Sequence, residues 1–268
     1  MKPDYWRQLD FFNPDNCDIS PTVIGAGSTG SFIVLGLAAM GFKKIVVIDH
    51  DNIDAHNMPN QFFAQSLLKD MVDGTISKVM MLKQTIAMLY PNTELIVYPI
   101  EVEETHNNKW FSPIVFSCVD DNKVREFIFQ NWQCDDLRGI LIDPRTGGEY
   151  YNVFVLTKYL RSSDYGYYIN SLEGETANLP CTGTSIADVA FAVAASCIQR
   201  MREYLKTNKC MLLHTFHDCK TNLTSYMRLS DEADFNDTNK YYKEPDVATG
   251  EEVKDEQSTD SDRQQDIA

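Results

Sequence analysis

Paired cysteines, membrane-length apolar runs and basic clusters are all missing from this sequence, and each absence excludes a class of protein. The seven cysteines are an odd number and are scattered without a C-x-x-C pair, so neither a disulfide framework nor a four-thiolate zinc site is indicated. No run is apolar enough to span a bilayer, and the N-terminus lacks the basic and apolar regions of a signal peptide. We therefore expect a cytoplasmic protein with no membrane partner.

Positive charge is scarce as well. The 268 residues carry a formal net charge of −15, of which residues 231–268, with 13 acids and 4 bases, contribute −9 and the rest −6. No basic stripe offsets this balance, so we expect no nucleic-acid partner. The stretch 231–268 has few apolar residues and is predicted to be a disordered acidic tail. With 43% hydrophobic residues in the chain, residues 1–230 are long enough for one α/β domain with a buried core.

The sequence GAGSTG at positions 25–30 is the feature around which this domain is organised. It follows a short apolar strand and precedes an apolar helix pattern, so Gly25 permits a tight turn, Gly27 lets backbone N–H groups approach a phosphate, and Gly30 lets the helix pack on the strand. Asp49 ends the next strand, nineteen positions after Gly30, near the spacing at which a carboxylate meets a ribose hydroxyl. Alone, the glycine pattern fits a nicotinamide or flavin enzyme, an ATP-using enzyme, or a junction that binds nothing.

Strand and helix patterns alternate after this loop, and no internal repeat is present. The alternation predicts an α/β fold, a doubly wound, mostly parallel, Rossmann-like sheet with an antiparallel C-terminal extension. A polar, aromatic loop is expected over 161–179. Helices are expected over 32–40, 76–90 and 186–205, and a further helix is expected to carry Arg125 one turn in. Strands are expected over 44–49, 94–100, 113–119, 139–143, 150–156, 211–216 and 224–229.

Polar side chains follow the parallel strands at their carboxyl ends, where open α/β sheets bind ligands. Asp49, Asp51, Asn57 and Asp120 lie in these positions, and Lys78 and Arg125 begin the helices that follow. Cations together with a metal-holding carboxylate suit a triphosphate better than a nicotinamide ring. Each residue also has an ordinary structural interpretation: Lys78 as a solvated charge, Arg125 as a partner of Asp121, and Asp120 as a helix cap.

Taken together, these motifs resemble the ThiF/MoeB adenylyltransferase family of the ubiquitin-activating-enzyme superfamily, over roughly residues 5–206. Arg7-Gln8 resembles the N-terminal Arg-Gln of that family, and GAGSTG resembles its phosphate loop. The run Asp49 to Gln61 is similar to its D-x-D-x-x-x-x-S-N-L-x-R-Q segment, and Asp120 and Arg125 keep the step of its D-N-x-x-x-R. Cys181-Thr182-Gly183 resembles its crossover-loop cysteine. Two positions depart from the pattern, since His56 replaces the serine and Asn60 the arginine.

The resemblance implies ATP and Mg²⁺ as cofactors and a ubiquitin-like or sulfur-carrier protein as the partner, whose C-terminal carboxylate is adenylated. It also implies a homodimer in which Arg7 reaches the other subunit. The implied catalytic residues are Arg7, Lys78, Asp120, Arg125 and Cys181, with Asp120 tied to the metal, and the implied nucleotide-binding residues are Gly25, Gly27, Gly30, Asp49, Asp51, Asn57 and Gln61.

Cys181 stands before an apolar helix, whose dipole would favour a thiolate able to accept the acyl group, but a cysteine packed in a loop fits equally well. Cys118 and Cys197 fall within apolar patterns and are poorer nucleophiles. A metal site at His214, His217 and Cys219 is disfavoured because they fall on a late strand and turn. Two other functions stay open: an NAD-dependent oxidoreductase, and an inactive nucleotide-binding module of the same fold.

Overall fold

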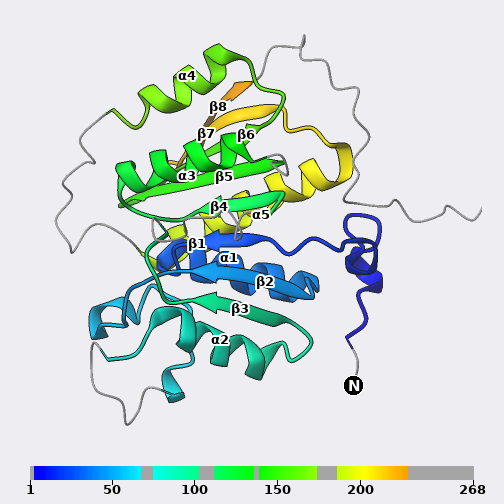
Figure 1. Cartoon of the computed structure of the whole chain (residues 1–268), viewed down its shortest axis with the longest axis vertical. Coiled ribbons are helices and arrows are strands. Elements are labelled where there is room, and N and C mark those ends of the chain that lie inside the picture. Colours follow the sequence, from blue (N-terminus) through cyan, green and yellow to red (C-terminus); the bar gives the residue numbers. More distant parts are fainter. Residues whose placement is uncertain (1–2, 68–74, 103–111, 136–138, 174–185, 229–268) are drawn as a thin grey trace, which may run out of the picture.

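The computed structural model describes residues 3–67, 75–102, 112–135, 139–173 and 186–228. These residues form one eight-stranded mixed sheet in the order β3-β2-β1-β4-β5-β6-β7-β8 (Figure 1). The strands are β1 (Thr22–Ile24), β2 (Lys44–Ile48), β3 (Glu94–Tyr98), β4 (Ile114–Ser117), β5 (Ile140–Gly147), β6 (Tyr150–Thr157), β7 (Leu212–Asp218) and β8 (Leu223–Arg228). The α-helices are α1 (Ser28–Met40), α2 (Lys78–Leu89), α3 (Asn122–Cys134), α4 (Ser162–Asn170) and α5 (Ala187–Thr207).

The first five strands are parallel, and β5 to β8 continue the sheet in antiparallel pairs. The predicted doubly wound sheet with an antiparallel extension is therefore confirmed. The chain passes from β1 to β2 on one side, whereas β4 pairs with the other side of β1. This reversal puts a topological switch point between β1 and β4, where sheets of this kind bind ligands beyond the strand ends.

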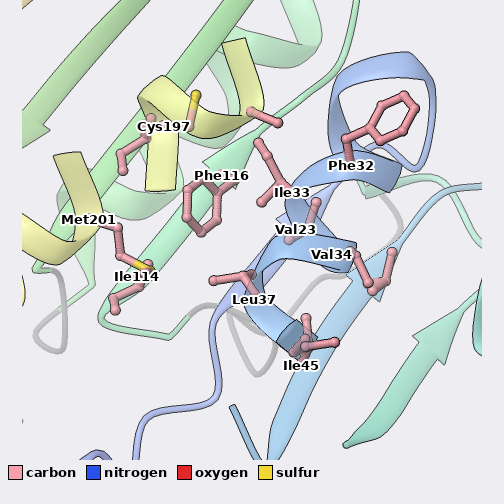
Figure 2. Packing of buried hydrophobic residues seen from close by; sticks show 14 of the residues in the cluster. Val23, Phe32, Ile33, Val34, Leu37, Ile45, Ile114, Phe116, Cys197 and Met201 are labelled. Carbon is pink, nitrogen blue, oxygen red and sulfur yellow. The ribbon is translucent and has the colours of Figure 1, made fainter. Parts of the chain in front are cut away.

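Alternate residues of the central strands feed two separate cores, one on each face of the sheet. The larger core packs Val23, Ile45 and Phe116 against α1, α2 and α5, and Figure 2 shows the close fit of Leu37 and Met201 around Phe116. The other face packs Val115 and Leu141 against α3 and α4. Because both faces are covered, the central strands read as continuous apolar runs.

Local sequence signals place the helix next to the glycine loop. The helix α1 ends at Gly41, whose φ of 97° lies in the left-handed region that closes helices. Gly36, in the middle of α1, faces α5, and an added Cβ there would lie 2.2 Å from Cδ1 of Ile198. The absence of a side chain at Gly36 is what allows α1 and α5 to pack closely beside the loop.

Two expectations from the sequence need correction. The stretch 161–179 was expected to be a loop, but α4 occupies residues 162–170 and is closed at its start by a capping box between Arg161 and Asp164. The strand expected over 139–143 runs on to Gly147, because β5 pairs with β6 along its whole length. The predicted tail over 231–268 lies outside the described residues. Every helix in the described ranges is too short or too polar to cross a membrane.

Candidate functional site

The glycine loop is fixed by backbone contacts with the strands on either side. The N–H of Gly25 donates to the carbonyl of Ile48 at 2.8 Å. Gly25 has a φ of 92°, and an added Cβ there would lie 2.4 Å from the carbonyl oxygen of Cys118, so only glycine fits. At Gly30 an added Cβ would lie 1.9 Å from the carbonyl oxygen of Gly25. Both predicted structural roles of these glycines are thus met.

Gly27 differs, because an added Cβ there would meet nothing within 4 Å. Gly27 is the N-cap of α1 and supplies no side chain to cap the first N–H groups. Open space in front of a helix N-terminus, beside a glycine loop, is the arrangement that accepts an anion. This geometry supports the phosphate-binding prediction for Gly27.

Asp49 holds the loop from the neighbouring strand. Its Oδ2 accepts from the N–H of Ala26 at 2.6 Å, and its Oδ1 accepts from the N–H of Asp51 at 2.8 Å. Burial raises the pKa of the Asp49 carboxyl, while the Ala26 N–H and the charge of Lys78 oppose that rise. Each carboxylate oxygen has a second lone pair, so the predicted ribose contact of Asp49 would add to its role as a support of the loop.

Lys78 begins α2 and points back to the loop after β2. Its Nζ lies 2.7 Å from Oδ2 of Asp51, and only 8% of the residue is exposed. The N–H of Lys78 also donates to the carbonyl of Asp51 at 2.9 Å. The interpretation of Lys78 as a solvated surface charge is therefore wrong. An almost buried ammonium held by one half-exposed carboxylate is available to a phosphate that competes for it.

Asp120 follows β4 and is exposed. Among the described residues, its carboxylate makes no hydrogen bond or ion pair, and only its carbonyl is engaged, by Nη1 of Arg125 at 3.0 Å. The cap of α3 is Asp121, whose Oδ1 accepts from Lys123 and Val124, so the interpretation of Asp120 as the cap is wrong. An unpaired, solvent-facing carboxylate at the switch point fits the hard, water-retaining ion Mg²⁺.

Arg125 does not pair with Asp121, as the alternative interpretation from the sequence suggested. Its Nε donates to Oδ1 of Asp143 at 3.0 Å, and Asp143 is fully buried. The Nη1 group also donates to Oδ1 of Asn122 at 3.2 Å. The guanidinium thus links α3 and β5 to the segment that carries Asp120.

Sequence reasoning missed the rest of this network. Oδ2 of Asp143 accepts from Nη2 of Arg145 at 2.8 Å and from the hydroxyl of Tyr168 at 3.0 Å. The guanidinium of Arg145 lies 4.3 Å from the centre of the Phe154 ring. Burial and the Asp143 charge raise the pKa of Tyr168. The available signal was the sequence Asp143-Pro144-Arg145, which puts two charges directly after the apolar run Ile140-Leu141-Ile142.

The remaining predicted nucleotide contacts are only partly described. Asn57 lies in the 3-10 turn Ala55–Asn57, and its side chain lies outside what the structure describes. The next turn approaches α1, since the N–H of Phe62 donates to Oγ of Ser31 at 2.9 Å. In this part of the structure, Oδ1 of Asn60 and Oε1 of Gln61 are buried without a hydrogen-bond partner. These two amide oxygens, next to the residue that contacts α1, are candidates for ligand contacts.

Arg7 is exposed in the 3-10 turn Trp6–Gln8, which contacts the end of α1 opposite to the glycine loop. Nε2 of Gln8 donates to the carbonyl of Met40, at the C-terminal end of α1, at 2.8 Å. Figure 1 shows this N-terminal segment beside the amino ends of the parallel strands, opposite the ligand edge. A nucleotide contact by Arg7 therefore requires a site on another copy of the chain.

Of the cysteines named from the sequence, Cys181 lies outside the described residues. Cys197 is fully buried in α5, and Cys118 lies under Gly25 and Gly30. Burial raises the pKa of both thiols, so neither suits a nucleophilic role.

The late histidines are occupied by other contacts. Nδ1 of His214 lies 2.9 Å from the hydroxyl of Tyr167, and its Nε2 lies 2.9 Å from Oδ1 of Asn152. Nδ1 of His217 lies 2.7 Å from Oγ1 of Thr224. The histidines and Cys219 form no metal cluster; among the described residues the grouping with metal-ligand spacing is Asp49, His50 and Asp51.

The sheet order and the glycine loop at its switch point define a Rossmann-like fold. The particular family follows from the sequence. Residues 17–237 match the profile of the ThiF family. The chain belongs to this family, within the superfamily of E1-like adenylyltransferases.

Individual relatives are similar over part of the chain. The SUMO-activating enzyme subunit uba-2 of Caenorhabditis elegans is 32% identical over 139 residues, which are 51% of this chain and 23% of that protein. The adenylyltransferase and sulfurtransferase UBA4 of Kluyveromyces lactis is 28% identical over 111 residues, which are 41% of this chain and 24% of that protein. The chain thus matches about a quarter of the length of these relatives.

Solved structures share the fold. Escherichia coli MccB crystallised with selenomethionine MccA has a TM-score of 0.64 at 15% identity, covering 87% of this chain and 74% of MccB. The MccB structure with ATP has a TM-score of 0.59 at 14% identity, covering 80% and 65%. At this identity the likeness concerns the arrangement of the sheet and helices.

Proposed function

We propose that this protein binds ATP at the carboxyl edge of its parallel strands and transfers AMP to a carboxylate, that of the C-terminus of a ubiquitin-like or sulfur-carrier protein. The observation that carries the proposal is the placement of three groups at one switch point: the glycine loop after β1, the Lys78–Asp51 pair beside β2, and Asp120 after β4, whose carboxylate has no partner in the described part of the chain. Membership of the ThiF family supports the same chemistry.

In the reaction, an oxygen of the carrier's C-terminal carboxylate attacks the α-phosphorus of ATP. A new P–O bond forms, the bond from the α-phosphorus to the bridging oxygen breaks, and pyrophosphate leaves with that electron pair. Gly27 and the N-terminus of α1 would face the phosphates, and Asp49 the ribose. Lys78 would exchange its contact with Asp51 for one with a phosphate oxygen, which stabilises charge on the leaving group.

Asp120 would hold Mg²⁺, and when bound this ion neutralises charge on the triphosphate. Arg7 would approach from a second copy of the chain, so the proposal includes a homodimer. The work of the protein is then to position two reactants and to compensate charge, because phosphoryl transfer needs little covalent help. Free ATP and carrier proteins meet in the cytoplasm, where we place the reaction.

Nucleotide choice tests the proposal against an oxidoreductase of the same fold. Calorimetric titration should show binding of ATP with Mg²⁺ and no comparable binding of NADH, and Asp120→Ala should abolish ATP–pyrophosphate exchange without lowering the unfolding temperature. Tight NADH binding with no ATP binding would contradict it. ATP binding without exchange for any carrier would favour an inactive module, the alternative that Asn60 in place of the family arginine raises.

A second step at Cys181 is also proposed, in which its thiolate attacks the carbonyl of the acyl-adenylate and AMP leaves, forming a thioester. A carrier adduct on a gel without reductant should then be present in the wild type and absent in Cys181→Ser, while acyl-adenylate still forms. Equal adducts in both proteins would remove Cys181 from the mechanism.

A further inference from the structure

The buried carboxylate of Asp143 is shared by two arginines that serve different parts of the molecule. Its Oδ1 accepts a hydrogen bond from the guanidinium of Arg125, and its Oδ2 accepts from the guanidinium of Arg145 and the hydroxyl of Tyr168. All of these side chains are buried or nearly so: the exposed fractions of the Arg125 and Asp143 side chains are 7% and 0%. In a site with so little water, the position of one charged group dictates the position of the next.

Arg125 uses three of its five N–H donors within the described part of the chain, and Nη2 is the group that stays available to a ligand. Its Nε is used by Asp143, and its Nη1 by the carbonyl of Asp120 and the amide of Asn122. The contact with Asp120 is made to the backbone, so it sets where the chain leaves β4 and where the carboxylate of Asp120 is presented. Through Nε and Nη1 the planar guanidinium connects α3 and β5 and fixes the backbone at Asp120, which is a positioning role.

The same network also fixes the end of α4. Nη1 of Arg145 donates to the carbonyl of Ser171 at 3.0 Å, and Nδ2 of Asn122 donates to the carbonyl of Leu172 at 3.2 Å. Asn122 in turn accepts from Arg125. Hydrogen bonds therefore connect Asp143, directly or through Arg125, Asn122 and Arg145, to the start of α3 and the end of α4.

We propose that Asp143 is a positioning residue of the adenylation site: it fixes Arg125, and Arg125 fixes the backbone segment that presents Asp120. This inference rests on the proposed function, and it gives Arg125 a positioning role through Nε and Nη1. The two oxygens of Asp143 allow it to be tested, because Arg125 uses one oxygen and Tyr168 the other. Asp143→Asn weakens the hold on Arg125, whereas Tyr168→Phe removes only a hydroxyl on the opposite side.

Two readouts separate positioning from general stability. The first is the Mg²⁺ concentration needed for half of the maximal ATP affinity, measured by calorimetry, which should rise at least about tenfold in Asp143→Asn. The second is amide hydrogen exchange in a peptide covering Cys118 to Val124, which should speed up in the same variant without any nucleotide. Tyr168→Phe should match the wild type in both readouts, even where its unfolding temperature falls.

Asp143→Glu covers the case in which Asp143→Asn does not fold. It keeps the charge but moves the carboxylate by one methylene, so a positioning role predicts the same two changes, whereas a purely electrostatic role predicts recovery. The inference would be overturned if a folded Asp143 variant showed the Mg²⁺ dependence and the amide hydrogen exchange of the wild type. It would also be overturned if Tyr168→Phe changed both readouts as much as the Asp143 variants do. If the wild type binds no ATP, the proposed function fails, and the hydrogen exchange still decides whether Asp143 fixes the segment.

Discussion

The ammonium of Lys78 lies 2.7 Å from Oδ2 of Asp51, at the edge of the glycine loop, although the lysine comes from α2 and the aspartate from the loop after β2. The two side chains differ in exposure, since 10% of the Lys78 side chain and 50% of the Asp51 side chain are accessible. An ion pair with one exposed partner contributes little to stability. The pair therefore keeps a cation oriented toward the ligand edge without locking it there.

Lys78→Met should lower ATP–pyrophosphate exchange by about a hundredfold or more, the scale of losing one group that stabilises developing negative charge. The protein should stay folded, because methionine keeps the length and apolar stem of the side chain. Lys83→Met is the matched control, since Lys83 lies on the same helix and is exposed. Wild-type exchange in Lys78→Met would contradict the role of this lysine.

Substituting alanine for Gly27, before α1, and for Gly30, in its first turn, should have opposite effects on stability and on ATP binding. Gly30→Ala forces a Cβ against the carbonyl of Gly25 and should lower the free energy of unfolding by about 1–3 kcal/mol. Gly27→Ala has open space and a φ of −74°, so its unfolding temperature should match the wild type. The added methyl should instead weaken ATP binding, because it fills the place of a phosphate.

Thermal unfolding and ATP titration on both glycine variants check this pair of outcomes. A stable Gly30→Ala protein together with an unstable Gly27→Ala protein would show that the loop is built differently.

Arg7 should act across a dimer. A mixture of inactive Arg7→Ala and inactive Asp120→Ala proteins should recover part of the exchange activity, because one site of each hybrid dimer then has both residues. Each variant alone, and a mixture of either with the double variant, serves as the control. Verified hybrid dimers without any activity would count against a contribution in trans.

His214 should make the fold sensitive to acid. Burial, with Arg145 nearby, lowers the pKa of His214 below its usual 6.5, so the unfolded chain binds its proton at a higher pH than the folded chain does. The free energy of unfolding should fall as the pH falls from about 6.5 toward the folded pKa. Above that window the neutral ring accepts from Tyr167 and donates to Asn152, so its contribution is fully present.

Urea unfolding at about pH 7.5 and about pH 5.5 measures this effect. The loss of stability on acidification should be smaller in His214→Gln than in the wild type. His217→Gln removes a histidine from the same strand without disturbing the Phe154 stack and should behave like the wild type. An unchanged loss in His214→Gln would assign the acid sensitivity to other groups.

Features with short-range causes were predictable from the sequence. The glycine loop and the apolar central strands each depend on neighbouring residues, and both appear where they were expected. The partner of Arg125 was not predictable, since Arg125 lies on helix α3 and Asp143 lies eighteen positions further on in strand β5, and only the folded chain brings the two together. The helix α4 was missed because its many tyrosines and Gly166 weaken the local helix signal, whereas Tyr168 is buried by tertiary packing.

Carrier-dependent exchange of labelled pyrophosphate into ATP tests the central claim most directly, with small proteins that end in Gly-Gly as the acceptors. The account predicts exchange that requires ATP, Mg²⁺ and such a carrier, and that is lost in a folded Asp120→Ala protein. Exchange at the wild-type rate in Asp120→Ala would contradict the account. So would a wild-type protein that binds NADH and shows no pyrophosphate exchange with any carrier.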